Sequence, residues 1–188
     1  MKKALIIHGW DGNTKEPLHQ YLRGELESLG YEITIPSMPN PATPVIKDWV
    51  DKIKSIFNEK TDLIIGHSIG CQAVLRFIET LDSKVSISKV ILIAPWMKLD
   101  MNTIEEEGEE VIAIAKPWME TPIDFDKVKK IVKSIVAIFS DNDSYVPLDQ
   151  VEYFRGKLGA VTYVEHNQGH FTVSDNFEKL QTDIKRLI

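Results

Sequence analysis

The sequence predicts an α/β protein whose parallel sheet is buried between two layers of helices. Short runs of Ile, Leu and Val alternate with longer stretches in which apolar residues recur every three or four positions. Continuous apolar runs are typical of parallel strands covered on both faces, and the longer pattern is typical of helices that pack on such a sheet. This alternation predicts about six mostly parallel strands with helices on both faces.

Six segments have the strand pattern and at least four have the helical one. The predicted strands are residues 5–7, 31–35, 62–65, 90–93, 135–139 and 161–164. The predicted helices are residues 18–29, a segment through Trp49, Ile53 and Ile56, a segment through Val74, Phe77 and Ile78, and a last helix over about 177–187. Gly30 ends the first helix, and a proline-rich loop precedes the second.

Residues 96 to about 121 break this alternation. The segment carries an acidic run from Glu105 to Glu110 together with methionine and tryptophan side chains. We expect it to form a small lid-like insertion in a single domain that spans residues 1–188. The acidic run itself is typical of a solvated surface.

Composition and charge exclude several classes of partner. The 188 residues carry a net charge of −6, which argues against the basic face that nucleic-acid binding requires. The apolar run at residues 4–7 is too short for a signal peptide, and no run approaches the roughly 20 apolar residues of a membrane span. The single cysteine, Cys71, suits a reducing compartment. We therefore expect a cytoplasmic protein that binds neither nucleic acid nor membrane.

A serine lies in the motif Gly66-His67-Ser68-Ile69-Gly70, directly after a predicted strand and before a predicted helix. So tight a turn crowds the backbone around Ser68, which favours glycine on both sides. It raises the serine hydroxyl over the carboxyl edge of the sheet and leaves the Ile69 N–H at a helix N-terminus, where it can stabilise an oxyanion. This context predicts a nucleophilic serine. The alternative is a plain glycine-rich turn capped by a serine.

A serine hydroxyl needs a base to take its proton, and two histidines follow the last predicted strand. His170 fits best, because Gly169 before it frees the backbone to aim the ring. His166 is the alternative base, and otherwise a surface residue. The pair has the spacing of a helical metal site, but Gly169 argues against a helix and no glutamate follows His166. We expect no metal ion here.

Two aspartates, Asp141 and Asp143, follow the fifth predicted strand, and either could hold the imidazole of the base. Asp141 is well placed to start an Asx-rich turn. Asp143 lies farther past the strand and four residues before Pro147, so its carboxylate is better placed to reach His170. The same run opens like a calcium loop, but the glycine and the bidentate glutamate of that loop are missing.

The end of the first predicted strand offers a second oxyanion donor. In His8-Gly9-Trp10, the Trp10 N–H is the candidate partner of the Ile69 N–H, with Gly9 permitting close approach. Neither G-x-G-x-x-G nor G-x-x-x-x-G-K-[ST] is present in the sequence. We therefore expect neither nucleotide binding nor a cofactor.

Together these elements resemble the α/β-hydrolase superfamily: residues 8–10, residues 66–70, Asp143 with Val146-Pro147, and Gly169-His170-Phe171. In its small size and in the proline-rich stretch ahead of Trp49, the chain resembles the small serine hydrolases related to retinoblastoma-binding protein nine. The resemblance spans the whole chain. It implies a reduced α/β-hydrolase fold, a Ser68-Asp143-His170 triad and activity on small esters.

Aromatic residues near the carboxyl ends of the strands, together with one from the insertion, are candidates for the substrate pocket. They are Trp10, Trp96, Trp118, Tyr145 and Phe171, and packing in the core is the alternative for each tryptophan. We predict a serine hydrolase that cleaves small carboxylic esters through an acyl-enzyme, with a small-molecule ester as its partner. The alternative is a protein-binding module on a hydrolase scaffold that retains little activity.

Overall fold

The computed structural model describes every residue except 1, 173–176, 178–181 and 183. Its centre is a six-stranded sheet in the order β2-β1-β3-β4-β5-β6, and each neighbouring pair is parallel. The strands are β1 (Lys2–Ile7), β2 (Tyr31–Thr34), β3 (Thr61–His67), β4 (Lys89–Ile93), β5 (Ile135–Ser140) and β6 (Val161–Glu165). The predicted α/β class and the six-stranded sheet are confirmed.

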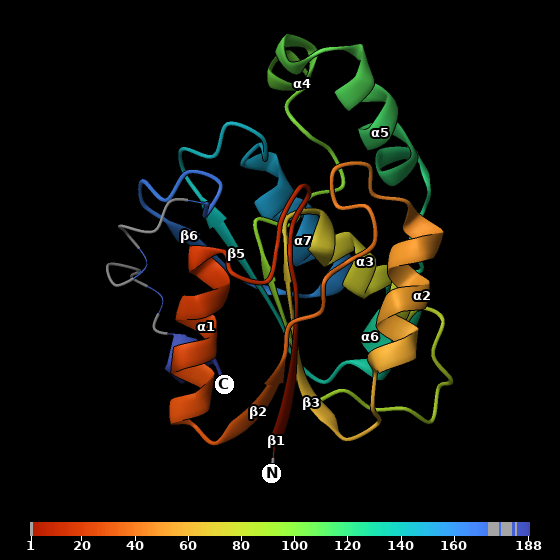
Figure 1. The fold of residues 1–188 in the computed structure, drawn as a ribbon, viewed down its shortest axis with the longest axis vertical. Helices are drawn as coiled ribbons and strands as arrows, with labels where there is room; N and C mark the ends of the chain where they lie inside the picture. The colour runs from red at the N-terminus through yellow and green to blue at the C-terminus, as the bar shows by residue number, and fades with distance from the viewer. Residues whose placement is uncertain (1, 173–176, 178–181, 183) are drawn as a thin grey trace.

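Helices cover both faces of this sheet, as Figure 1 shows. They are α1 (Pro17–Ser28), α2 (Ile46–Ile56), α3 (Ile69–Ile78), α4 (Met101–Glu107), α5 (Glu109–Glu120), α6 (Phe125–Ile131), α7 (Asp149–Leu158) and α8 (Ile184–Leu187). Helices α1 and α8 contact each other on one face, while α2, α3, α6 and α7 form a contiguous layer on the other. The predicted last helix falls partly outside the described residues.

Burial follows the position of each strand in the sheet. Every residue of β5, which lies between β4 and β6 in the sheet, is buried. The edge strand β6 has the same β-branched composition, yet Val161 and Val164 are exposed. A strand at an edge has one neighbour instead of two, so its apolar side chains are less completely covered. Among the described residues, no helix is long and apolar enough to cross a membrane.

The parallel arrangement brings the carboxyl ends of the strands to one edge of the sheet. The segments that carry the predicted site residues all leave the sheet there, after β1, β3, β4, β5 and β6. Helices α4 and α5, which fold from the irregular segment after β4, stand above the same edge in Figure 1. The functional site is therefore expected between this edge and the two helices.

Candidate active site

Ser68 occupies a strained turn between β3 and α3. Its φ of 53° lies in the left-handed region that residues other than glycine rarely adopt. A Cβ at Gly66 would stand 2.8 Å from the Cα of Cys71, and one at Gly70 would stand 2.5 Å from the His8 carbonyl oxygen. Both flanking glycines are therefore sterically required. Strain of this kind is held where the surrounding structure needs a side chain in one exact place.

A hydrogen-bonded chain links Ser68 to a histidine and an aspartate from two other loops. The Ser68 hydroxyl lies 2.8 Å from Nε2 of His170, and Nδ1 of His170 lies 2.7 Å from Oδ2 of Asp143. The other oxygen of Asp143 accepts the N–H groups of Tyr145 and Val146 at 2.9 and 3.1 Å. The Asp143 side chain is 1% exposed. Its carboxylate is thus fixed by the backbone and directed at the imidazole.

The two alternative residues, Asp141 and His166, pair with each other instead. Nδ1 of His166 lies 2.5 Å from Oδ2 of Asp141, and the His166 side chain is 66% exposed. The Asn167 N–H donates to the same carboxylate and, with the imidazole, holds the pKa of Asp141 below its usual value. Since the structure gives this pair no contact with Ser68, it brings His170 and Asp143, not Asp141 and His166, to the serine.

The expected oxyanion donors belong to the residue that follows Ser68 and to the residue that follows Gly9. Ile69 is the first residue of α3, so its N–H has no acceptor within the helix. Gly9 lies close to the serine, because a Cβ there would stand 3.3 Å from the Cβ of Ser68. Among the hydrogen bonds of the described residues, neither the Trp10 N–H nor the Ile69 N–H donates to a backbone carbonyl. The Trp10 indole is fixed separately, by donating to the Ala42 carbonyl oxygen.

A cavity of about 400 Å³ opens over the serine. Such a volume is within the range of small-molecule sites. The expected pocket residues Trp10, Trp96 and Tyr145 line it together with Ser68 and His170. Trp96 also directs its indole N–H toward the Ser68 hydroxyl, at 3.4 Å. Its ring is therefore a wall of the space next to the nucleophile.

The structure does not bring Trp118 or Phe171 to this cavity, which corrects their expected position. Trp118 is 1% exposed, donates to the Pro44 carbonyl oxygen and packs edge-on against Trp49. The amphipathic pattern of α5 turns this ring toward α2 and away from the cavity. Phe171 is equally buried, with its N–H bonded to the Gln168 carbonyl, and it is not a lining residue.

The irregular segment supplies cavity residues that sequence reasoning missed. Leu99, Ile104, Glu107 and Val111 all line the cavity, although the acidic run was expected to be solvated surface. The Tyr145 hydroxyl donates to Glu107 at 2.5 Å, and this bond raises the pKa of Tyr145 to about 12. No local pattern distinguishes Glu107 from its acidic neighbours, because only the fold of α4 selects which of them faces inward.

A buried parallel sheet with its serine on a strand-to-helix elbow is the architecture of the α/β hydrolases. The chain belongs to the serine hydrolase family, whose model matches residues 4–188. It is 28% identical over 182 residues to the hydrolase YdeN of Bacillus subtilis, covering 95% of this chain and 90% of that one. It is 25% identical to the serine hydrolase RBBP9 of Rattus norvegicus, covering 98% and 89%. The protein is therefore a hydrolase enzyme.

Solved structures show the same fold. The crystal structure of the Bacillus subtilis ydeN product superposes with a TM-score of 0.80 at 25% identity, covering all of this chain and 96% of that one. A carboxylesterase structure from Nitrososphaera gargenis superposes with a TM-score of 0.72 at 12% identity, covering 95% and 86%. The resemblance to the small serine hydrolases and the α/β-hydrolase fold are thereby confirmed.

Proposed function

We propose that the protein is a carboxylesterase that hydrolyses small esters through an acyl-enzyme, with Ser68 as nucleophile. The observation that carries the proposal is the hydrogen-bonded chain from Ser68 through His170 to Asp143. The serine attacks the ester carbonyl while His170 takes its proton, and the imidazole then returns that proton to the leaving alcohol. Water then attacks the acyl-serine in the same way, with His170 taking a proton from the water and returning it to the Ser68 oxygen as the carboxylic acid leaves. Asp143 holds the proton of the imidazole on Nδ1 throughout.

The tetrahedral intermediate requires donors for its oxyanion. The Trp10 and Ile69 N–H groups are our candidates, because Trp10 lines the same cavity as the serine, Ile69 directly follows it, and neither N–H donates to a backbone carbonyl among the described residues. One of these donors begins a helix, whose N-terminal partial charge adds to the stabilisation. Fixed donors of this kind need no reorganisation as the charge develops.

The cavity walls favour a small acyl group. Trp96, Leu99 and Ile104 offer apolar surface beside the serine, and a volume of about 400 Å³ limits the length of the chain that fits. We propose that α4 and α5, within the insertion expected over residues 96–121, act as a lid over this pocket. Their residues Ile104, Glu107 and Val111 support this assignment, because each reaches the cavity from above the sheet.

Esterase activity is expected to fall as the solution becomes acidic, because a protonated imidazole cannot accept the serine proton. The experiment is the rate of p-nitrophenyl acetate hydrolysis against pH for the wild type, His170→Ala and His166→Ala. We expect His170→Ala to be inactive at every pH and His166→Ala to keep the wild-type profile. An inactive, folded His166→Ala variant would contradict the assignment of the base. A wild type that turns over no ester in the panel would favour the alternative, a binding module with vestigial chemistry.

Trp96 is expected to limit acyl-chain length, whereas Trp118 is not. Removing a side chain from the pocket wall opens volume next to the nucleophile, so Trp96→Ala should shift the preference of kcat/KM toward longer p-nitrophenyl esters. Trp118→Phe is the matched control, because Trp118 lies in the core. It should lower stability by about 1–3 kcal/mol and leave the chain-length profile unchanged. Identical profiles for the wild type and Trp96→Ala would remove Trp96 from the pocket wall.

The remaining expectations on partners and location stay predictions. Hydrolase relatives support a small-molecule substrate, and a small ester is our specific proposal. Cys71 is buried in α3, with its thiol directed at the Gly66 carbonyl oxygen, so it is not placed to form an exposed disulfide. This burial is compatible with the reducing cytoplasm that we propose for the protein.

A further inference from the structure

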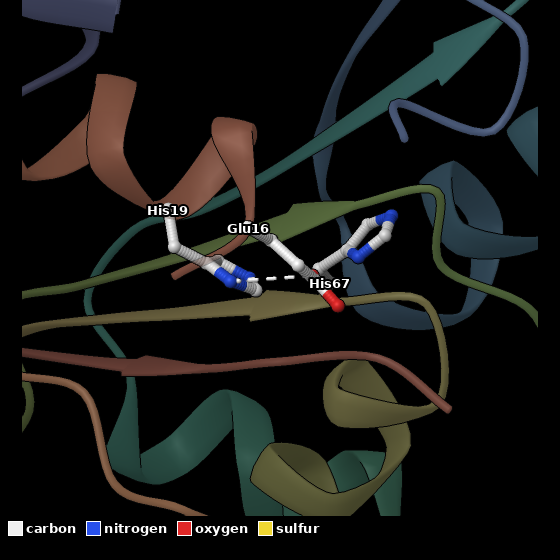
Figure 2. Close-up of side chains that lie close together, drawn as sticks. All are labelled: Glu16, His19 and His67. Atoms are coloured by element: carbon white, nitrogen blue, oxygen red, sulfur yellow. Dashed lines mark ion pairs between the residues drawn. The ribbon is translucent and has the colours of Figure 1, made fainter. Parts of the chain in front are cut away.

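The imidazole of His67 lies close to the serine–histidine–aspartate chain without belonging to it. His67 is the last residue of β3 and directly precedes Ser68. As Figure 2 shows, its side chain lies beside those of His19 in α1 and of Glu16 just before that helix. Only 3% of His67 is exposed. Burying a polar ring costs free energy unless the ring makes hydrogen bonds, so its partners indicate what this imidazole does.

A hydrogen bond joins the His67 ring to the loop that carries His170. Nε2 of His67 lies 2.9 Å from the backbone carbonyl oxygen of His170. A carbonyl oxygen only accepts, so Nε2 carries a hydrogen and donates, whatever the charge of the ring. The two rings are also close to each other, with centroids 5.3 Å apart. A side chain at the end of β3 therefore holds the backbone of His170.

The backbone of this loop needs such support. Asn167, Gly169 and Phe171 have φ values of 55°, 52° and 56°, all in the left-handed region. Glycine adopts this region freely and asparagine fairly often, whereas phenylalanine rarely does. Strain of this kind persists only where the surrounding structure fixes the chain. The carbonyl that His67 holds belongs to the peptide bond between His170 and Phe171, so the hydrogen bond acts directly on the strained position.

Hydrogen bonds fix this loop from two sides. The N–H groups of the two residues before His170 donate to the Ser140 hydroxyl oxygen at 3.0 Å and to the Asn142 side-chain oxygen at 2.8 Å. Both acceptors belong to the end of β5 and the loop after it. The His67 bond comes from β3 instead and acts on the peptide group that follows the Cα of His170. That Cα therefore lies between anchors in both chain directions, which fixes where its imidazole begins.

The neighbours of His67 keep its ring in the position that this bond requires. A Cβ at Gly9 would stand 3.1 Å from Nδ1 of His67, closer than an ordinary van der Waals contact. Glycine at this position therefore leaves the space that the ring occupies. The His19 ring packs edge-on against that of His67, with centroids 6.1 Å apart. A ring confined by its neighbours loses little further rotational freedom when it donates to the carbonyl.

We propose that His67 is a positioning residue for the hydrolysis: its Nε2–H holds the His170 backbone so that the imidazole of His170 meets the Ser68 hydroxyl at 2.8 Å. The inference rests on the proposed function, because it concerns the base of that reaction. Proton transfer needs the base within hydrogen-bond reach, and a misplacement of about 1 Å can cost about 10²-fold in rate. Loss of the bond should therefore lower kcat. KM should change little, because His170 serves both acylation and deacylation and the pocket walls remain.

The experiment compares His67→Met with His67→Gln in the full-length protein at equal folded fraction. The two replacements have similar length, but only glutamine has an N–H donor that can reach the His170 carbonyl. On p-nitrophenyl acetate we expect His67→Met to lose about 10- to 100-fold in kcat, with KM within about threefold of the wild type. His67→Gln should restore kcat to within about fivefold of the wild type. Equal kcat in the two variants would overturn the proposal, because the donor would then make no difference.

A second measurement does not depend on the folding of a variant. Long-range ¹H–¹⁵N NMR spectra of the wild-type protein should show a hydrogen on Nε2 of His67. A hydrogen on Nδ1 alone would overturn the proposal, since Nε2 could then not donate to the His170 carbonyl. An active wild type with an equally active His67→Met variant would refute the positioning role alone. A wild type that turns over no ester would refute the proposed function, and the role of His67 with it.

Discussion

Ser68→Ala is expected to abolish ester hydrolysis while leaving the fold intact. The hydroxyl that forms the acyl-enzyme is lost, and removing the nucleophile of a serine protease lowers kcat on the order of 10⁶-fold. The backbone should tolerate the change, because alanine and serine share the Cβ that already stands at φ 53°. The measurements are p-nitrophenyl acetate turnover and labelling by a fluorophosphonate probe. Both should disappear, with thermal unfolding close to that of the wild type.

A neighbouring serine provides the matched control for this variant. Ser144 is exposed in the loop after β5, and the hydrogen bond given for it uses its backbone carbonyl, which accepts from Thr103. Ser144→Ala should therefore keep both turnover and labelling. Full activity in folded Ser68→Ala would refute the nucleophilic mechanism outright.

Asp143→Asn is expected to lower turnover by about 10⁴-fold, as the equivalent change does in a serine protease triad. One oxygen of Asp143 accepts two backbone N–H groups, so the amide oxygen of asparagine must take that side. The amide NH₂ then faces Nδ1 of His170 and forces the ring hydrogen onto Nε2. In that tautomer Nε2 has no lone pair with which to accept the serine proton.

Asp141→Asn is the matched comparison, because it makes the same chemical change two residues away. Its carboxylate contacts the exposed His166 and the Asn167 N–H, with no contact to Ser68. Its turnover should stay within a few-fold of the wild type when the two variants are compared at equal folded fraction. A larger loss in Asp141→Asn than in Asp143→Asn would transfer the role of the acid to Asp141.

Local sequence patterns were sufficient for the sheet and for much of the candidate site. Apolar runs and their alternation with helical patterns predicted six strands, because strands buried on both faces of a parallel sheet consist almost entirely of apolar residues. The strand-to-helix turn at Ser68 could also be predicted, since the crowding at Gly66 and Gly70 requires glycine at fixed positions around the serine. His170 and Asp143 could be selected because parallel strands deliver their following loops to one edge.

Only the tertiary structure decided which aspartate pairs with which histidine and which residues of α4 and α5 face the cavity. Asp141 in the loop after β5 pairs with His166 in the loop after β6. This contact, and not a sequence pattern, distinguishes these two residues from Asp143 and His170. Trp118 turns into the core while Glu107 faces the cavity, because the packing of α4 and α5 against the rest of the molecule sets their rotation.

The contact between His67 and the loop of the base could not be predicted from the sequence for a related reason. Nε2 of His67 and the carbonyl oxygen of His170 lie 2.9 Å apart, although 103 residues separate them in the chain. Composition and periodicity determined the layers of this protein, because they report how each segment is buried. Which polar groups meet inside those layers depends on contacts between distant segments, and no local pattern records such contacts.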